Sequence, residues 1–185
     1  QSINVHPLWR QLDGTDQDYW GQCRPWILAR DFTNAVCADL LNILRMTSKM
    51  DDHWLTKDIA AISLNRLAEW GPAEAGVAME LGNYFQVIEV RDYVSARRAC
   101  EDAIRTCGTN RQVKAGAQLA LATSLLPVGN DFQKVQDLLS SIDEADLSGE
   151  DRRLKRICEG DLFFAMGRPE LAAGRYKEAG TRALR

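Results

Sequence analysis

A pattern that recurs every 37 to 40 residues places the strongest constraint on how this chain folds. In its first part, a small residue stands three positions before a large apolar one, in Gly82 and Phe85, in Ala122 and Leu125, and in Gly160 and Phe163. Its second part combines small and apolar residues at spacings of four and then three, in Ala96, Cys100 and Ala103, in Val135, Leu139 and Ile142, and in Ala172, Tyr176 and Ala179. Because the two parts advance together along the chain, each copy indicates one structural unit.

Apolar residues three and four positions apart lie on one face of an α-helix. Each copy of the pattern therefore predicts two antiparallel helices joined by a short turn. A weaker copy lies upstream, at Leu40, Leu41 and Leu44 and then at Ala60, Leu64 and Leu67. We expect an all-α fold of about four helical hairpins, which cover residues 31–70, 73–107, 112–143 and 149–185.

Turn and capping residues stand between the predicted helices. The two helices of each later hairpin are divided by Arg91-Asp92, by Gly129-Asn130-Asp131 and by Gly167-Arg168-Pro169. We expect Asp51 or Asp52 to cap the helix that follows it, since a carboxylate accepts hydrogen bonds from the first free N–H groups. Ser148 with Asp151 resembles a capping box that opens another helix.

Two small residues of the last hairpin, Gly160 and Ala172, are expected to let its helices pack closely. A glycine inside a helix costs about 1 kcal/mol relative to alanine, so only a crowded contact offsets it. We expect Phe163 and Tyr176 to be the large side chains that fill the space. Replacing Gly160 with leucine should then be strongly destabilising.

The last unit resembles a tetratricopeptide repeat (TPR), through Gly160, Phe163, Gly167, Ala172, Tyr176 and Ala179. The family pattern runs W-x-x-L-G-x-x-Y and then A, F and A. This unit departs from it at Arg156 and Glu159, which stand where Trp and Leu are usual. The resemblance implies a right-handed superhelical array of hairpins, a solenoid with a concave groove. Because the period exceeds the usual length of about 34 residues, other helical-hairpin solenoids stay open.

The resemblance also implies a protein–protein interaction module that binds a peptide or helix of a partner, within a larger protein or complex. Its groove would be lined by Leu81, Phe85, Ile88, Gln118, Ser124, Leu154, Asp161 and Phe164, with Ala78 and Ala117 beside them. The Lys and Asn set with which some TPR domains hold a C-terminal carboxylate is absent from these positions, which favours an apolar or mixed ligand. The alternative that several of these side chains pack internally stays open.

Two other functions stay open as well. One is a structural or docking segment of a multidomain enzyme or signalling protein. The other is a helical domain that binds a small ligand with the help of residues 1–30. We read those residues as an irregular lead-in, and its tryptophans, Trp9, Trp20 and Trp26, are otherwise expected to cap the first hairpin.

The last predicted helix has no polar capping helix after it to cover its apolar face. The last helix is expected to run from Pro169 to Arg185 without a glycine stop, and no polar capping helix follows. Solenoids usually end in such a helix. We therefore expect a piece of a longer repeat protein, or an end covered by a partner or by self-association with a second copy.

The charge balance argues against polyanion binding. Lys and Arg number 23 and Asp and Glu 26, which gives a net charge of −3, and attraction to phosphates needs clustered positive charge. Arg152, Arg153 and Arg156 form a basic patch on one helix face, suited to an acidic or phosphorylated peptide. A solvated, salt-bridged face is the favoured interpretation. No aromatic residues alternate with these arginines to stack on bases, so we expect no nucleic acid partner.

No pattern in the chain indicates an enzyme, and we expect no catalytic residues, no cofactor and no metal. The two histidines, His6 and His53, have no nucleophile in a recognisable context. The acidic stretch around Asp13 lacks the ligand spacing of a calcium loop. No apolar run approaches the roughly 20 residues of a membrane span. Five scattered cysteines favour a reducing, cytoplasmic compartment, while the start at Gln1 leaves an exported form open.

Overall fold

The structure is a computed structural model that describes residues 21, 24–25, 27–29, 37–49, 52–66, 75–86, 91–129 and 131–180. Throughout these ranges the regular elements are helices and none is a strand, so the prediction of an all-α protein is confirmed. The chain divides into two compact units, Gln1–Trp70 and Gly71–Arg185. Trp9, Trp20 and Trp26 lie outside the described residues, and their capping role stays a prediction.

The first unit contains a pair of packed helices, α2 (Cys37–Lys49) and α3 (His53–Asn65). Their apolar faces meet through buried side chains, among them Leu40, Ile43, Leu44, Leu55 and Ile59. Asp52 caps α3 as expected, because its Oδ1 accepts a hydrogen bond from the Leu55 N–H at 3.2 Å. Asp52 also forms an ion pair with Arg24.

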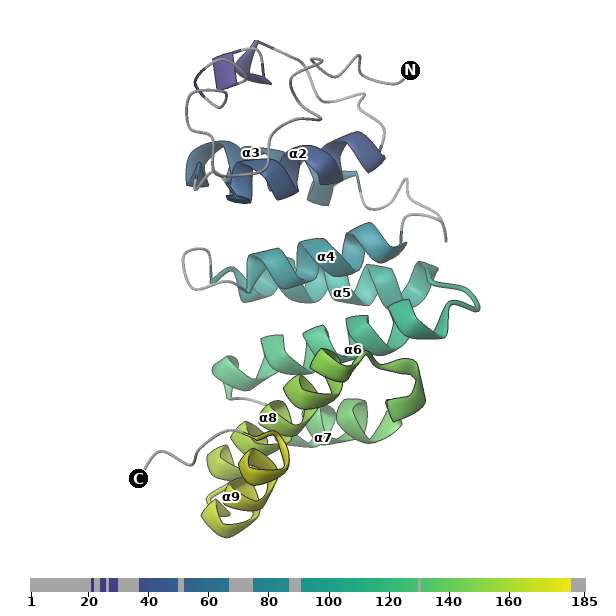
Figure 1. Cartoon of the computed structure of the whole chain (residues 1–185), viewed down its shortest axis with the longest axis vertical. Coiled ribbons are helices and arrows are strands. Elements are labelled where there is room, and N and C mark those ends of the chain that lie inside the picture. The colour runs from purple at the N-terminus through teal and green to yellow at the C-terminus, as the bar shows by residue number, and fades with distance from the viewer. Residues whose placement is uncertain are drawn as a thin grey trace. The chain divides into compact units, whose positions relative to one another are not determined.

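The second unit contains three further helix pairs (Figure 1). The pairs are α4 (Ala75–Phe85) with α5 (Tyr93–Thr106), α6 (Arg111–Leu125) with α7 (Phe132–Ser141), and α8 (Gly149–Ala165) with α9 (Pro169–Glu178). Two short 3-10 helices, η4 (Leu126–Val128) and η5 (Glu144–Asp146), lie on either side of α7. Each pair overlaps one of the predicted hairpin ranges, although α6 begins one residue before the predicted range 112–143, and the 3-10 helices had no sequence signal.

Polar side chains start four of these helices at the predicted breaks. The N-caps are Asp92 for α5, Asn110 for α6, Asp131 for α7 and Ser148 for α8. Each accepts a hydrogen bond from a backbone N–H in the first turn, which satisfies a donor that the helix itself leaves unpaired. At Ser148 the Oγ accepts from the Asp151 N–H at 3.1 Å and donates to the Asp151 carboxylate at 2.7 Å. The predicted capping box is therefore confirmed.

The last helix is shorter than expected. We predicted that it runs to Arg185 without a glycine stop, but α9 ends at Glu178 and Gly180 adopts a positive φ of 70°. The Gly180 N–H donates to the Lys177 carbonyl at 3.0 Å and closes the helix end. Glycine takes this left-handed conformation without the steric cost that a Cβ brings, which makes it a frequent helix stop. The expectation of an unstopped helix was wrong for this reason.

The glycines of the recurring pattern lie at close helix contacts. A Cβ built on Gly160 would lie 2.5 Å from Cε1 of Tyr176, closer than side chains approach one another. The expected packing of Tyr176 against Gly160 is thus confirmed. Gly82 occupies the corresponding place in α4, where an added Cβ would collide with Sγ of Cys100 from α5. Equivalent residues of the repeat therefore make equivalent contacts in the first and last pairs of this unit.

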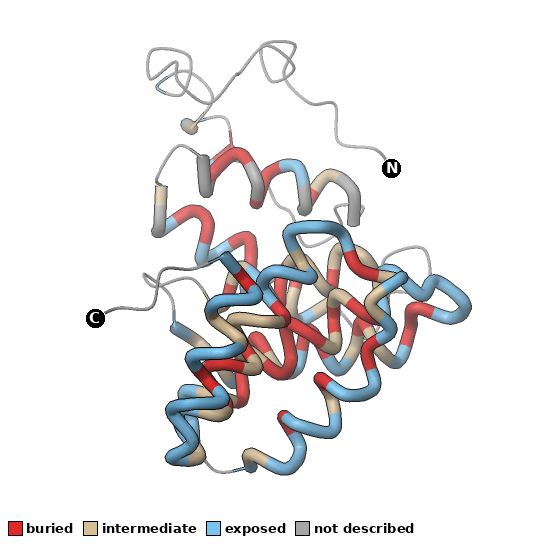
Figure 2. Tube along the Cα trace, turned by 60° about the horizontal axis from the view of Figure 1, so that its bottom comes forward, coloured by how far each residue is buried: buried red, intermediate tan, exposed pale blue. Residues whose placement is uncertain are grey.

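Successive pairs contact one another through their first helices and also through the second helix of one pair and the first helix of the next. α4 packs against α6 and α6 packs against α8, while α5 contacts α6 and α7 contacts α8. The Gln86 side chain at the end of α4 donates to the Ala120 carbonyl of α6 at 3.0 Å. Figure 2 shows the buried positions gathered along the helix sides that face each other. The first helices α4, α6 and α8 thus contribute residues to one surface of the unit.

Candidate functional site

A cavity of about 540 Å³ opens between α4, α6 and the start of α8. Its volume falls within the range of about 300–1,000 Å³ that is typical of ligand-binding clefts. We call it the groove. It is lined by Met79, Asn83, Gln112, Val113, Gly116, Leu119, Ala120, Asp146, Leu147, Ser148, Glu150, Asp151 and Leu154.

The apolar part of the groove comes from all three helices and from the residue after η5. Its large members are Met79, Val113, Leu119, Leu147 and Leu154. Gly116 makes room for one of them, because a Cβ at this position would lie 2.6 Å from the Met79 sulfur. A thioether side chain is flexible and polarisable, so it adapts to different apolar groups. The groove thus offers an adaptable apolar contact area.

The polar part of the groove is acidic. Asp146, Glu150 and Asp151 line it, and no Lys or Arg does so within the described residues. Asp151 serves in the capping box. Two amide side chains, Asn83 from α4 and Gln112 from α6, are exposed on the opposite elements. The groove therefore combines negative charge with neutral hydrogen-bonding groups.

A second cavity, of about 250 Å³, adjoins the groove at Asp146. Its lining has charges of both signs, since it includes Arg111 and Lys114 as well as Asp143 and Asp146. Gln118, one of the predicted partner-binding residues, also lines it and donates to Ser141 Oγ at 3.0 Å. This hydrogen bond links α6 to α7, so Gln118 has a structural contact of its own.

Several of the residues predicted to line a groove lie inside the unit instead. Leu81 is fully buried, Phe85 is 4% exposed, and Ser124 is buried with its hydroxyl donating to the Leu121 carbonyl at 2.7 Å. Ala78 and Ala117 are buried too. Their apolar spacing marks the face that each helix packs against its neighbours. This outcome matches the alternative that several of these side chains pack internally. Ile88 lies outside the described residues.

The three predicted residues on α8 are accessible. Leu154 is 40% exposed and lines the groove. Phe164 is 68% exposed, and Asp161 is exposed and accepts a hydrogen bond from the Tyr176 hydroxyl at 2.6 Å. Neither Phe164 nor Asp161 is among the residues that line the groove. Leu154 is thus the predicted partner-binding residue that the structure places in this cavity.

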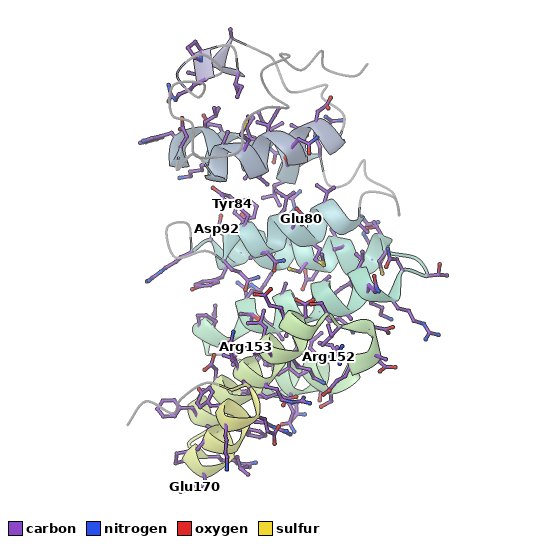
Figure 3. All side chains as sticks on the ribbon, viewed as in Figure 1. Glu80, Tyr84, Asp92, Arg152, Arg153 and Glu170 are labelled. Atoms are coloured by element: carbon purple, nitrogen blue, oxygen red, sulfur yellow. The ribbon has the colours of Figure 1, made fainter. Side chains whose placement is uncertain are left out.

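The basic patch is divided between solvent and internal contacts (Figure 3). Arg152 and Arg153 are exposed, and their guanidinium groups donate to the backbone carbonyls of Ser148 and Ala179. Arg156 instead forms a bidentate pair with Glu144, with 2.9 Å from Nη2 to Oε2, and contacts Glu178 at 3.4 Å. Its charge is already matched, which agrees with the salt-bridged face that we favoured for this run.

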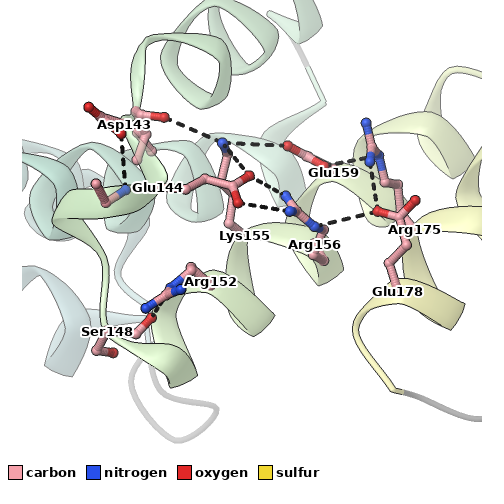
Figure 4. A network of polar contacts seen from close by, with 11 residues as sticks. Asp143, Glu144, Ser148, Arg152, Lys155, Arg156, Glu159, Arg175 and Glu178 are labelled. Atoms are coloured by element: carbon pink, nitrogen blue, oxygen red, sulfur yellow. Dashed lines mark hydrogen bonds and ion pairs between the residues drawn. The ribbon is translucent and has the colours of Figure 1, made fainter.

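A charge network around α8 fixes the acidic segment beside the groove (Figure 4). The buried Lys155 ammonium lies 3.4 Å from Glu144 of η5 and 3.9 Å from Glu159. The paired guanidinium of Arg156 is the main reason that the pKa of Glu144 falls from 4.5 to about 2. Because η5 is tied to α8 in this way, Asp146 is held at the edge of the groove.

Two of the thiols have no reactive character. Burial raises the pKa of Cys100 and of Cys158 to about 12, so both are protonated at neutral pH. A protonated thiol is neither a nucleophile nor a metal ligand. Within the described ranges, no group of three or more His, Cys, Asp and Glu side chains is arranged to hold a metal ion. Over the same ranges, no helix has the length and apolar character needed to cross a bilayer.

Sequence reasoning missed most of the residues that form the groove. Asp146 lies between two predicted hairpins, and Glu150 lies at the start of the last one, where we predicted only a capping box. Met79 and Asn83 lie next to the apolar pattern of α4 rather than on it. A signal was present, since the acidic residues cluster beside a helix start, but the sequence did not show which helices they face.

A scan against models of known protein families matches none of them, and searches of curated proteins and of solved structures return no match. The geometry of the groove is therefore the basis for a functional proposal.

Proposed function

We propose that the chain is a protein–protein interaction module built as a TPR-like array of helical hairpins, and that it binds a segment of a partner protein in the groove. The observation that carries this proposal is the cavity of about 540 Å³ formed by the first helices of three successive pairs. A groove that several helices share suits an extended or helical peptide, because such a ligand contacts consecutive helices along its length.

The pattern of helix contacts supports the array. First helices contact first helices, in α4 with α6 and α6 with α8, and the second helix of one pair contacts the first helix of the next. Stacked hairpins in a solenoid make these nearest-neighbour contacts. The matching glycine contacts, Gly82 on Cys100 and Gly160 on Tyr176, support the same repeat unit.

The side chains of the groove favour binding of a polypeptide over catalysis. Among the described residues that line the groove, Ser148 is the one with a hydroxyl group. Both hydrogen bonds of that hydroxyl are made within the capping box. The lining residues include no His, Cys or Lys. Large aliphatic side chains beside exposed amides are instead the groups that hold a polypeptide, since they contact its apolar side chains and its backbone.

An unbiased peptide selection tests this function. A displayed library of random dodecapeptides is selected on the purified, immobilised chain, and enriched peptides are measured by fluorescence polarisation. We expect the wild type to bind them and the Leu154→Lys variant to lose at least about tenfold in affinity, because the new side chain fills the groove. Leu171→Lys in α9 is the matched control, since Leu171 is 50% exposed and does not line the groove. Failure to enrich peptides, or equal losses in both variants, would contradict the proposal.

Self-association through the C-terminal helices stays a prediction. The large apolar side chains exposed in this hairpin are Leu154, Phe164 and Leu171, of which Phe164 and Leu171 lie outside the groove. Light scattering over a range of protein concentrations measures the molar mass. Self-association should raise the mass of the wild type with concentration, and the Phe164→Glu variant should stay monomeric.

A further inference from the structure

We propose that the occupant of the groove is a cationic segment of a partner protein, in which Lys or Arg side chains stand next to large aliphatic ones. This inference rests on the proposed function and adds the chemistry of the ligand. Three features of the groove carry it: unpaired carboxylates, an apolar lining and unoccupied amides.

The carboxylates of the groove differ from those of the charge network around α8. Glu144, Glu159 and Glu178 each form ion pairs with Lys155, Arg156 or Arg175. Asp146, Glu150 and Asp151 form none with any Lys or Arg of the described chain. Like charges that share one cavity repel each other, and a basic side chain from a partner relieves that repulsion.

The helix start explains only part of this acidity. Glu150 and Asp151 lie in the first turn of α8, where the helix dipole favours negative charge. That dipole is equivalent to roughly half an elementary positive charge, which is small against three carboxylates. Asp146 lies before α8, so the dipole does not account for it. The lining of the groove itself is therefore negatively charged, with Arg111 and Lys114 in the adjoining cavity, and it attracts cations and repels phosphate groups.

The lining of the groove calls for an apolar side chain as well. Met79, Val113 and Leu154 offer thioether and aliphatic surface beside the acidic residues. A purely hydrophilic cation would leave this surface without a partner. An aliphatic residue next to a basic one satisfies both parts, because burial of apolar area is the main favourable term in protein association.

The amides favour a polypeptide over a small cation. Asn83 and Gln112 are exposed, and neither side-chain amide takes part in a hydrogen bond within the described structure. Each amide has both a donor and an acceptor, and the peptide backbone offers the complementary pair at every residue. A polyamine has donors but no carbonyl groups, so it would leave the amide donors unused.

Fluorescence polarisation with defined peptides tests the inference on the full chain. The probe is a fluorescein-labelled hexapeptide, blocked at both ends, in which arginine and leucine alternate. Two matched peptides replace either arginine with glutamate or leucine with serine. We expect saturable binding of the arginine–leucine peptide and at least about tenfold weaker binding of both others. Raising salt from 0.1 M to 1 M shortens the Debye length from about 10 Å to about 3 Å, and affinity should fall severalfold.

Charge-neutral variants locate the binding. The double variant Asp146→Asn with Glu150→Gln should lower affinity about tenfold, because it removes two attractive charges. The control, Asp137→Asn with Glu170→Gln, changes net charge by the same amount at exposed sites outside both cavities. It should leave affinity unchanged. Both proteins should keep the wild-type circular dichroism spectrum and melting temperature.

Three outcomes overturn the inference. Equal affinity of the two double variants would show that the basic side chains bind outside the groove. A preference for the glutamate–leucine peptide would show that the groove selects an anionic ligand and not a cationic one. Equal binding of the arginine–serine peptide, together with competition by spermine, would assign the groove to small cations. If the random library yields acidic or neutral peptides whose binding still depends on Leu154, this inference fails while the proposed function stands.

Discussion

Helix α8 carries acidic side chains in two settings that differ in how their charge is met. Toward α9 and η5, its Glu159 shares a network with Lys155, Arg156 and Arg175 in which each carboxylate has a basic partner. At its start, Glu150 and Asp151 line a cavity without one. The difference separates two uses of charge within one helix. The paired groups join elements of the fold. Asp151 takes part only in the capping box of its own helix, and Glu150 has no ion pair within the described structure and is available to a ligand.

The largest effect should come from the packed side of α8. Gly160→Leu forces a branched side chain into the ring of Tyr176, which is held by its hydrogen bond to Asp161. Overpacking of this kind costs about 1–3 kcal/mol and sometimes more, and we expect a loss of about 3 kcal/mol because the ring of Tyr176 must leave its contact with Gly160. Urea unfolding followed by circular dichroism measures it.

Alanine substitutions provide the matched comparison for this site. Gly160→Ala should also destabilise the protein, since a Cβ at this position already lies 2.5 Å from the Tyr176 ring. At Gly174 in α9, nothing lies within 4 Å of an added Cβ. Gly174→Ala should therefore stabilise the protein by up to about 1 kcal/mol through helix propensity. Changes of the same sign at both sites would contradict the close contact.

The next effect concerns the cation at the centre of the network. Lys155→Met removes a buried ammonium and leaves Glu144 and Glu159 with fewer partners. Breaking a buried ion pair costs about 3–5 kcal/mol. We expect about 2 kcal/mol, because the two carboxylates keep Arg156 and Arg175. Thermal unfolding measures the change.

Arg152→Met is the control for the buried lysine. Arg152 is exposed, and within the described residues its side chain makes one hydrogen bond, of 3.4 Å to the Ser148 carbonyl. Surface contacts of this kind contribute little, so the variant should stay within about 0.5 kcal/mol of the wild type. A loss as large as that of Lys155→Met would show that position in the network does not determine the energetic effect.

A smaller effect should appear as a dependence of stability on pH. The pKa of Glu144 falls from 4.5 to about 2, chiefly through its hydrogen bonds to Arg156. Since the folded pKa is the lower one, this contribution is complete above pH 4.5 and is lost as the pH falls toward 2. Glu144 is 40% exposed, so the contribution should stay below about 1 kcal/mol. Acid unfolding of Glu144→Gln should show a correspondingly weaker pH dependence in this range, and Glu170→Gln should not.

The helix pairs were predictable from sequence because local chemistry specifies them. Gly82 and Gly160 recur with their large partners, and polar caps such as Asp92 and Ser148 stand where the helices begin. These signals act over a few residues and do not depend on tertiary context. The end of α9 was missed even so, because Gly180 was read as part of the helical pattern and not as its stop.

The groove was not predictable in the same way. Leu81 and Phe85 were placed in a groove from the resemblance to the TPR family, yet both lie on the apolar face that α4 buries against its neighbours. The groove is lined instead by Met79 and Asn83, which are rotated away from that face. Part of its acidic side, Asp146, belongs to η5. Ion pairs of Glu144 with Lys155 and Arg156 attach η5 to α8. Spacing within a helix does not reveal such contacts.

The smallest effect on stability should come from the carboxylates of the groove. Asp146→Asn with Glu150→Gln removes charges that have no basic partner in the described structure, so it breaks no ion pair. Loss of the Glu150 charge weakens a favourable interaction with the start of α8, by about 0.3–1 kcal/mol at most. Relief of the repulsion among three like charges opposes that loss. The two terms should leave unfolding free energy within about 0.5 kcal/mol of the wild type. A loss comparable to that of Lys155→Met would show that these carboxylates support the fold as the paired ones do, and the contrast between the two settings of α8 would disappear.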